Sequence, residues 1–427
     1  MLKLIKTILL AHTIGFCSSS YAAVNGKLLI VGGALSADNA AIYKALINGL
    51  PNTQSKLAIV PAASGKPASY AKKFADDLQR YGLPRDRVLV LPVATLDDPT
   101  TKNVDESQWR NNANNLQKLP ALTDVGGFWF LGGDQMRIIE TLRPHAEQPS
   151  ALLKIIQQKL TQGAIVGGTS AGAAMMSDPM IAAGDSISAL QLPPAKHYSG
   201  MEQQEYGALY LHHGLGFFSN GIVDQHFDRK GRLGRLVRTL HETAVTKNMR
   251  NKGFGVDEDT AMLVDYASNT FTVLGAGNVV TLNSKDAAFK SQPFAAKNLS
   301  LAVFASGDKV DLDSLQLLNA ETNSRTVGRE YANSPPYQGG GLGIGNARLD
   351  QTLGYDLLDN AASKELRRYT FLEDGSSWIY RFRETANSQG YWRYRSGTRD
   401  QYSITNVMFD IEPLTLPKLE STAKSMQ

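Results

Sequence analysis

One short stretch, residues 163–176, constrains both the fold and the chemistry of this chain. The apolar run Ala164-Ile-Val166 leads into Gly168-Thr-Ser170-Ala-Gly172, and small residues follow. This order is typical of a strand, a tight turn and a helix, with the serine at the carboxyl end of the strand. Only small neighbours tolerate the strained backbone of such a turn. The pattern predicts that Ser170 is an exposed nucleophile and that the Ala171 N–H faces a developing oxyanion.

The first part of the chain alternates short apolar segments with amphipathic ones. Helical patterns cover residues 39–50, 68–81 and 151–160, between apolar segments at 28–32, 57–61, 88–92, 127–131 and 164–166. Apolar strands separated by crossover helices indicate an α/β fold with a parallel sheet covered by helices on both faces. Ligands bind at the carboxyl ends of such strands. We therefore expect the Gly-rich or polar segments that follow four of these strands to converge on one crevice.

Residues 286–427 have a different pattern. Strand-like alternation occurs at residues 299–304, 378–382 and 402–409, and polar loops join these segments. The glycine-rich segment 334–345 lacks the spacing of a phosphate-binding loop, so we interpret it as a linker. The sequence thus predicts an α/β domain over residues 23–285 and a mostly β C-terminal domain over residues 286–427, whose role the sequence does not reveal.

The amino terminus has the pattern of a secretory signal peptide. Lys3 and Lys6 precede a short apolar run, and Ser20-Tyr21-Ala22 forms a small-residue cleavage site. Cleavage after Ala22 would make the protein extracellular or periplasmic. The apolar run is too short for a membrane span. Cys17, the only cysteine of the chain, would leave with the leader, so the mature protein would have no disulfide and no cysteine-ligated metal.

Composition excludes several other classes of function. The chain has 427 residues, of which 42% are hydrophobic and 20% charged, as in ordinary globular proteins. The formal net charge of +4 falls by two when the two leader lysines are removed, which argues against a nucleic-acid partner. No residues have the spacing of a metal site apart from the adjacent pair His212 and His213, so we expect no metal and no cofactor.

A serine nucleophile needs a base and an acid. His226 is the favoured base because an apolar strand, 221–223, delivers Asp224, Gln225 and His226 in succession at its end. For the acid, Glu258 follows the apolar stretch 253–256, whereas Asp185 lies nearer to the serine in sequence and is the alternative. Both carboxylates stay open on this reasoning, with Glu258 preferred.

A basic run follows the candidate base directly. Lys230, Arg232 and Arg235 all lie within residues 228–238. A basic helix face is usually solvated surface. Here the charges lie close to His226 in sequence, so we interpret them as a grip for an acidic substrate, for which guanidinium forks suit carboxylates.

Four ordered motifs together resemble the cyanophycinase family over roughly residues 25–285. They are 168–173, 130–135, 224–227 with 231–235, and 257–261. Cyanophycinases are serine exopeptidases related to peptidase E, with a fold similar to class I glutamine amidotransferases and hence flavodoxin-like. Their substrate is cyanophycin, multi-L-arginyl-poly-L-aspartate, from which they release β-Asp-Arg dipeptides. The resemblance implies the same polymer as partner here. A secreted aspartyl or isoaspartyl dipeptidase of the same fold is the alternative.

The resemblance also implies a role for individual residues. Ser170 would be the nucleophile, His226 the general base and then acid, and Glu258 the third member of the triad. Backbone N–H groups near Gly133 and at Ala171 would form the oxyanion hole. The substrate site would be lined by Gln135, Asp224, Gln225, Lys230, Arg232 and Arg235.

Two features depart from the family pattern. Lys230 stands where the family commonly has arginine, which removes one bidentate contact. Residues 185–214 form a longer segment than the family core has, and we expect a rim or lid there. The oligomeric state, a homo-oligomer included, is left open by the sequence.

Overall fold

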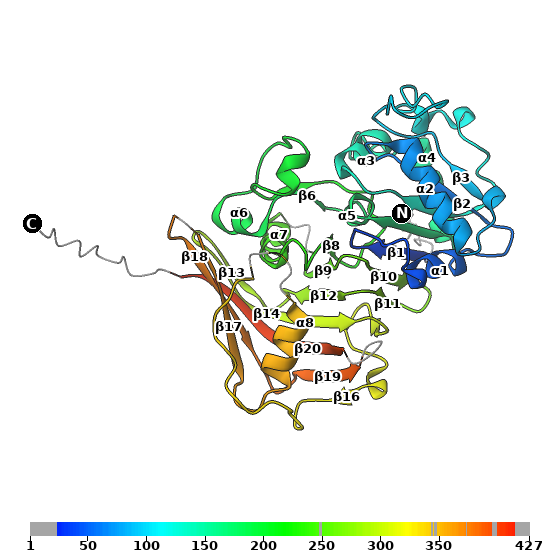
Figure 1. The fold of residues 1–427 in the computed structure, drawn as a ribbon. Coiled ribbons are helices and arrows are strands. Elements are labelled where there is room, and N and C mark those ends of the chain that lie inside the picture. Colours follow the sequence, from blue (N-terminus) through cyan, green and yellow to red (C-terminus); the bar gives the residue numbers. More distant parts are fainter. Residues whose placement is uncertain are drawn as a thin grey trace, which may run out of the picture.

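The computed structural model describes residues 24–246, 250–342, 345, 348–372, 374–394 and 399–414. The expected leader, with Cys17 and the cleavage site at Ala22, lies outside the described residues. Two large sheets dominate the fold (Figure 1), and helices cover both faces of one of them. Among the described residues, no helix combines the length and hydrophobicity needed to cross a bilayer.

The first sheet has eight strands in the order β15-β11-β10-β1-β5-β4-β2-β3. From β1 to β3 all neighbours are parallel, and β10, β11 and β15 extend the sheet with antiparallel pairing. The expected parallel sheet is therefore confirmed, and it carries an antiparallel edge. The strands are β1 (Lys27–Val31), β2 (Lys56–Val60), β3 (Val88–Val90), β4 (Val125–Phe130), β5 (Ile165–Thr169), β10 (Thr260–Asp265), β11 (Thr270–Gly275) and β15 (Lys309–Asp311).

Helices cover both faces of this sheet because its strands are apolar on both sides. In β1, Leu29 and Val31 belong to the core under helices α1 and α2, whereas Leu28 and Ile30 belong to the core under α3 and α4. Successive strand residues point to opposite faces, so one strand serves two cores. The four helices are α1 (Ala40–Asn48), α2 (Pro67–Arg80), α3 (Gln135–Leu142) and α4 (Ala151–Thr161).

The second sheet has ten strands, with β16-β19-β20-β14-β12-β9-β8 as its path. The pair β8 and β9 is parallel, and the other pairs are antiparallel. The three expected strands of the C-terminal part form within β14, β18 and β20, and β20 pairs with both of the others. The strands are β8 (Ile222–Asp224), β9 (Lys252–Val256), β12 (Asn278–Asn283), β13 (Ala288–Ser291), β14 (Phe294–Ala305), β16 (Ser324–Arg325), β17 (Glu365–Phe371), β18 (Ser377–Arg383), β19 (Gln389–Tyr394) and β20 (Asp400–Pro413).

Smaller elements fill the space around the two sheets. Helix α7 (Leu233–Val245) packs with α6 (Ser186–Gln191), and a two-stranded sheet pairs β6 (Met180–Ala183) with β7 (Tyr210–His212). The other helices are α5 (Ala171–Ala174) and α8 (Leu349–Leu353). Short helical turns lie at Arg85–Arg87, Asn112–Asn114, Leu116–Lys118, Met201–Gln204, Ala320–Thr322 and Gly354–Leu358.

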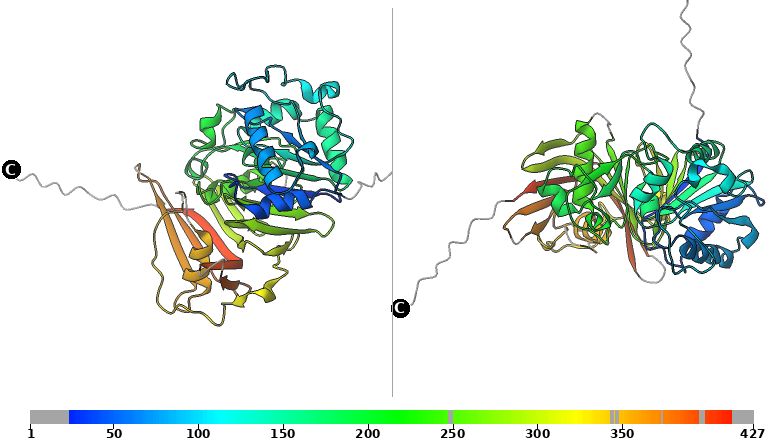
Figure 2. Two further views of the ribbon diagram at one scale, coloured as in Figure 1. Left: turned by 45° about the vertical axis from the view of Figure 1, so that its right-hand side comes forward. Right: turned by 90° about the horizontal axis from the view of Figure 1, so that it is seen from above.

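The expected domain boundary at residues 285 and 286 falls inside the second sheet. Strand β12 lies before it and pairs with β14 after it, from Asn278 opposite Ala305 to Asn283 opposite Ser300. In the first sheet, β15 from the C-terminal part likewise pairs with β11. Figure 2 shows the C-terminal strands as a lobe beside the helix-covered sheet. That residues 286–427 form a separate domain stays a prediction, and main-chain hydrogen bonds join the two parts.

Candidate active site

Ser170 lies at the turn between strand β5 and helix α5, with a strained backbone. Its φ is +54° and its ψ is −111°, a conformation that residues other than glycine rarely adopt. A Cβ at Gly168 would lie 2.5 Å from the Gly172 carbonyl oxygen, and one at Gly172 would lie 2.5 Å from the Phe130 oxygen. Both flanking glycines are therefore required by close backbone packing, as the sequence pattern predicts.

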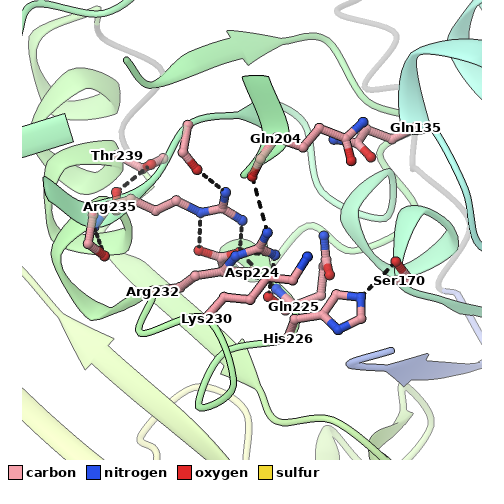
Figure 3. A network of polar contacts seen from close by, with 12 residues as sticks. Gln135, Ser170, Gln204, Asp224, Gln225, His226, Lys230, Arg232, Arg235 and Thr239 are labelled. Carbon is pink, nitrogen blue, oxygen red and sulfur yellow. Dashed lines mark hydrogen bonds and ion pairs between the residues drawn. The ribbon is translucent and has the colours of Figure 1, made fainter. Parts of the chain in front are cut away.

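His226 and Glu258 come from neighbouring strands of the second sheet. Strands β8 and β9 are parallel, so the residues just beyond their carboxyl ends lie side by side. The His226 Nε2 is 2.9 Å from the Ser170 Oγ, and its Nδ1 is 2.6 Å from the Glu258 Oε1. Figure 3 shows the imidazole directed at the serine. Serine, histidine and carboxylate thus form one hydrogen-bonded chain.

Asp185, the alternative acid, lies at the start of helix α6 and serves that helix. Its Oδ1 accepts a 2.9 Å hydrogen bond from the Ser188 N–H, and its Oδ2 accepts one of 2.7 Å from the Gly207 N–H. This is the ordinary work of a helix N-cap. Of the two candidate acids, the structure therefore places Glu258 at the histidine.

The carboxyl end of strand β1 holds together the three loops that carry this chain of groups. The Ser170 N–H donates to the Val31 carbonyl at 3.1 Å, and the His226 N–H donates to the Gly32 carbonyl at 2.6 Å. The Asp259 N–H, next to Glu258, donates to the Gly33 carbonyl at 2.8 Å. Three successive carbonyls thus receive one N–H each from the loops of the serine, the histidine and the acid.

Backbone strain is concentrated at the same place. Ser170, His226 and Asp259 have φ values of +54°, +48° and +49°. Left-handed backbone at such residues costs about 1–3 kcal/mol each and persists where the surroundings determine it. Gly33 has a φ of +108°, and a Cβ there would lie 2.2 Å from the His226 Cε1. The imidazole therefore occupies the space that a side chain at Gly33 would fill.

The surroundings of His226 favour its neutral form. Burial, and then the positive charges of Lys230, Arg232 and Arg235, lower its pKa well below the usual 6.5. The hydrogen bond to Glu258 opposes this shift because a carboxylate favours the imidazolium. The net direction is downward, so the Nε2 can accept a proton from the Ser170 hydroxyl at neutral pH.

Glu258 has a second carboxylate close by. Burial raises the pKa of Glu258, and the charge of Asp228 raises it further, whereas Arg229, Lys230 and Arg232 act in the opposite direction. The Asp228 Oδ1 also accepts a 3.3 Å hydrogen bond from the Glu258 N–H. Asp228 therefore positions the backbone of the acid as well as acting on its charge.

Two backbone N–H groups, those of Gly133 and Ala171, were expected near the oxyanion. Gly133 has a φ of +140°, and a Cβ there would lie 2.1 Å from the Ala63 oxygen, so the Gly132-Gly133 loop passes tightly beside the neighbouring loop. A Cβ at Gly132 would in turn meet the Ser170 Cβ at 3.3 Å. Helix α5 spans only four residues. Any oxyanion stabilisation would thus come from individual N–H groups rather than from a long helix dipole.

Asp224 and Arg235 were expected to contact substrate, and the structure places them differently. Their side chains are 0% and 2% exposed. The Arg235 Nε donates to the Asp224 Oδ2 at 2.9 Å, and its Nη1 donates to the Gly184 carbonyl (Figure 3). The sequence pattern was interpreted as a basic face that grips an acidic substrate, but α7 packs against α6. The two buried charges bind each other.

Arg232 and Lys230 contact the long segment 185–214. The Arg232 Nη1 donates to the Gln225 carbonyl at 2.5 Å, and its Nη2 donates to the Gln204 carbonyl at 3.4 Å. Lys230 pairs with Glu205 in a close salt bridge. The segment thus lies against the basic run, in the position expected of a rim. Of the three cations, Lys230 is the most exposed, at 28%.

Gln135 and Gln225 present polar atoms that lack partners. Both residues are buried, and within the described part of the chain neither side-chain oxygen has a hydrogen-bond partner. The Gln135 amide nitrogen is held by the Ala182 carbonyl. Unpaired buried acceptors are costly unless a donor arrives. The two oxygens can therefore receive N–H groups of a bound molecule, and the expected substrate role of both residues stays a prediction.

Comparison with known proteins gives this arrangement a family. The model of peptidase family S51 matches residues 28–271, more than half of the chain. The chain belongs to peptidase family S51. It is a serine-type peptidase.

Individual relatives of this S51 peptidase share about a quarter of its residues. It is 27% identical over 269 residues to a cyanophycinase of Synechococcus elongatus, which covers 61% of this chain and 71% of that protein. It is 26% identical over 307 residues to a cyanophycinase of Trichormus variabilis, with 70% and 89% covered. A solved peptidase from an acI-B1 Actinobacterium has a TM-score of 0.41 at 18% identity, covering 68% of this chain and 98% of that one.

Several site residues of this S51 peptidase were missed by the sequence analysis. Gly33 was noted only as part of a Gly-rich segment, Asp228 only as part of the basic run, and Glu205 not at all. A glycine pair after the first strand is a signal of close backbone approach. For Glu205 and Asp228 no local signal exists, because their roles depend on long-range packing.

Proposed function

We propose that this peptidase hydrolyses cyanophycin with Ser170 as nucleophile, His226 as general base and Glu258 as the acid that orients it. The observation that carries the proposal is the continuous chain of 2.9 Å and 2.6 Å hydrogen bonds through His226. A neutral imidazole between a serine hydroxyl and a carboxylate has the geometry required for nucleophilic acyl transfer.

The proposed reaction proceeds in two halves. The Ser170 Oγ attacks the scissile carbonyl carbon while the His226 Nε2 takes the hydroxyl proton, and Glu258 stabilises the imidazolium that forms. The N–H groups of Gly133 and Ala171 receive the oxyanion of the tetrahedral intermediate. His226 then gives its proton to the departing amine, which leaves an acyl-enzyme on Ser170. Water, deprotonated by His226, attacks this ester and releases the second product.

The charges beside the triad support a substrate that carries both signs. Lys230, Arg232 and Arg235 face two carboxylates, Asp224 and Glu205, so this group has one cation more than it has anions. A substrate carboxylate suits that surplus. The unpartnered oxygens of Gln135 and Gln225 suit guanidinium N–H groups. A β-Asp-Arg unit contains both kinds of group.

A short aspartyl or isoaspartyl peptide is the second candidate substrate. One observation favours it: Arg235 binds Asp224 and is 2% exposed, so fewer cations are free for polymer carboxylates than the sequence suggests. We also propose that the protein acts outside the cytoplasm after cleavage near Ala22, on the basis of the leader pattern alone.

Incubation of the chain from residue 23 with insoluble cyanophycin, and separately with Asp-containing dipeptides, tests the proposal. We expect β-Asp-Arg from the polymer, identified by mass, and no product from the Ser170→Ala variant. Free arginine as the primary product would mean that the side-chain bond is cut, and would contradict the assignment. Turnover of the dipeptides alone would establish the second candidate.

A further inference from the structure

A cavity of about 160 Å³ lies where the family-matched residues meet the C-terminal part. Ser170 and His226 do not line it, but Glu258 does, so it touches the proposed triad only through the acid. Its volume is well above the roughly 10–15 Å³ that one water requires. The lining residues come from the loop after β8, the loop after β9, strand β12, the start of α8 and the start of β20.

Carboxylates outnumber cations on the cavity wall. Asp228, Asp257, Glu258, Asp350 and Asp400 line it together with Arg232, Arg348 and Arg399. Two of these arginines already have partners: Arg348 has one on the wall, and Arg232 has others outside the cavity. The Arg348 Nε binds the Asp350 Oδ1 at 3.0 Å, and Arg232 donates to the Gln225 and Gln204 carbonyls. Asp228, Asp257 and Asp400 form no ion pair within the described residues.

Asp257 gives independent support for a ligand. It is 4% exposed and lines the cavity. Its Oδ2 accepts hydrogen bonds from the Asn278 N–H at 2.9 Å and from the Asn278 side chain at 3.3 Å. Its Oδ1 has no hydrogen-bond partner among the described residues. Such a buried oxygen costs free energy unless a donor reaches it.

The charges around Asp257 also favour a bound cation. Burial raises the pKa of Asp257 well above its usual range, and the negative charges of Asp228 and Asp350 raise it further. A cation bound between these carboxylates would favour the charged form of Asp257 and relieve the repulsion among them.

The residues that line the cavity indicate which kind of cation it can bind. No group of three or more His, Cys, Asp and Glu side chains in the described part of the chain is arranged to hold a metal ion. Apolar side chains make up much of the remaining wall: Phe227, Leu233, Val280, Leu342 and Leu349. A guanidinium is more weakly hydrated than an ammonium and presents a planar fork to carboxylates. Its aliphatic arm can lie on apolar surface.

We propose that this cavity binds an alkylguanidinium group, with its head between Asp257 and Asp228 and its aliphatic arm on Phe227 and Leu349. The inference rests on the contacts of the cavity and not on the proposed function. Two sources share this chemistry: an arginyl branch of a bound polymer, and a free arginine-containing product. In either case the ligand would lie against Glu258, so occupancy of the cavity would act on the charge of the proposed triad acid.

The experiment measures binding on the full chain carrying Ser170→Ala, so that no turnover interferes. N-acetyl-arginine amide is titrated by calorimetry, with the uncharged N-acetyl-citrulline amide as the matched probe. We expect saturable binding of the arginine probe and none of the citrulline probe. Added Asp257→Asn or Asp228→Asn should each weaken the arginine probe by about tenfold or more, as expected for loss of one partner of a desolvated charge pair. The exposed Asp286→Asn is the control and should leave the Kd unchanged.

Thermal unfolding of the same samples shows whether each variant is folded and whether the probe stabilises it. The Asp257→Asn variant should fold, because the amide has nearly the shape of the carboxyl and its oxygen can still accept the hydrogen bonds from Asn278. The arginine probe should raise the Tm of the parent and of the Asp286→Asn variant, but not of Asp257→Asn. No probe binding, or binding that neither Asp257→Asn nor Asp228→Asn weakens, would overturn the proposal. Weakening by Gln225→Ala instead would place the probe beside Ser170 and would also overturn it.

A sedimentation assay separates the two sources, and only this arm rests on the proposed function. Ser170→Ala protein is pelleted with insoluble cyanophycin, with and without Asp257→Asn. Reduced co-sedimentation of the Asp257→Asn variant would identify a polymer branch as the occupant. Unchanged co-sedimentation, together with probe binding, would identify a free arginine-containing product.

Discussion

The two sheets of this peptidase contribute different halves of the candidate site. The eight-stranded sheet carries Ser170 at the end of β5, and the ten-stranded sheet carries His226 and Glu258 at the ends of β8 and β9. Apart from β15, every strand of the first sheet lies wholly or partly within the family-matched residues 28–271. In the second sheet only β8 and β9 lie within that range. The two strands that carry the candidate base and acid are therefore joined, through the pairing of β9 with β12, to strands outside the family match.

The C-terminal residues are connected to the candidate site through the strands that carry its base and acid. Strand β9 pairs with β12, which in turn pairs with β14. Phe304 of β14 lies in the same core as Phe254 of β9, and both contact Phe271. We conclude that the C-terminal part is continuous with the half of the molecule that positions the base and acid.

The most severe test of this continuity is a chain that ends at residue 285. It would leave β12 without β14 and expose the two cores to which Phe304 and Val303 contribute. We expect loss of cooperative folding, measured by circular dichroism and soluble yield. A chain that ends at residue 414 keeps every described residue and is the control. If the chain ending at 285 folds and hydrolyses substrate at the rate of the full chain, residues 286–427 are a separate domain after all.

The two candidate acids lie in different places: Glu258 follows a strand of the second sheet, and Asp185 lies at the start of helix α6. Replacing each of them in turn tests which one acts with His226. Glu258→Gln should lower kcat/KM by about 10⁴-fold, because the amide no longer stabilises the imidazolium. Asp185→Asn keeps a good N-cap at helix α6 and should leave kcat/KM unchanged. Steady-state kinetics on cyanophycin checks both. The opposite ranking would return Asp185 to the triad.

Gly33 tests the contact between the end of β1 and the imidazole. Gly33→Ala adds a Cβ 2.2 Å from the His226 Cε1 at a φ of +108°. Gly82→Ala is the matched control, since Gly82 has a φ of +98° but nothing within 4 Å of the added Cβ. The left-handed backbone alone should cost both variants about 1–3 kcal/mol of unfolding free energy. Only Gly33→Ala should also lower kcat, and equal kcat values would remove Gly33 from the site.

The pH dependence gives the smallest expected effect. Burial and nearby cations lower the pKa of His226 from the usual 6.5, and kcat/KM requires the neutral imidazole. The acid limb of kcat/KM should therefore lie below pH 6.5. Lys230→Met removes one of the cations and frees Glu205, so it should move that limb to higher pH. A limb that stays in place, or moves to lower pH, would show that these charges do not control His226.

Much of the first sheet could be predicted from the sequence because its signals are local. Apolar strands, crossover helices and the Gly168-x-Ser170-x-Gly172 turn each depend on neighbours in the chain. His226 and Glu258 could be predicted because each follows an apolar strand. That these two strands belong to a second sheet could not be predicted, because strand order depends on long-range pairing.

The charged residues in and near helix α7 show more clearly what could not be predicted from the sequence. Arg235 and Asp224 lie in the expected motif, yet they bind each other at 2% and 0% exposure. A sequence gives the spacing of charges along a helix but not which face is covered by α6. The roles of Asp228 and Glu205 arise in the same way, from segments that only the fold brings together.

We propose that residues from both sheets act as one catalytic unit. This proposal is tested by kcat/KM for Ser170→Ala, His226→Ala and the double variant. Each single variant should lose about 10⁴-fold or more, and the double variant should lose no more than the worse of the two, because groups that act as a unit are strongly non-additive. Losses that multiply in the double variant would contradict the claim.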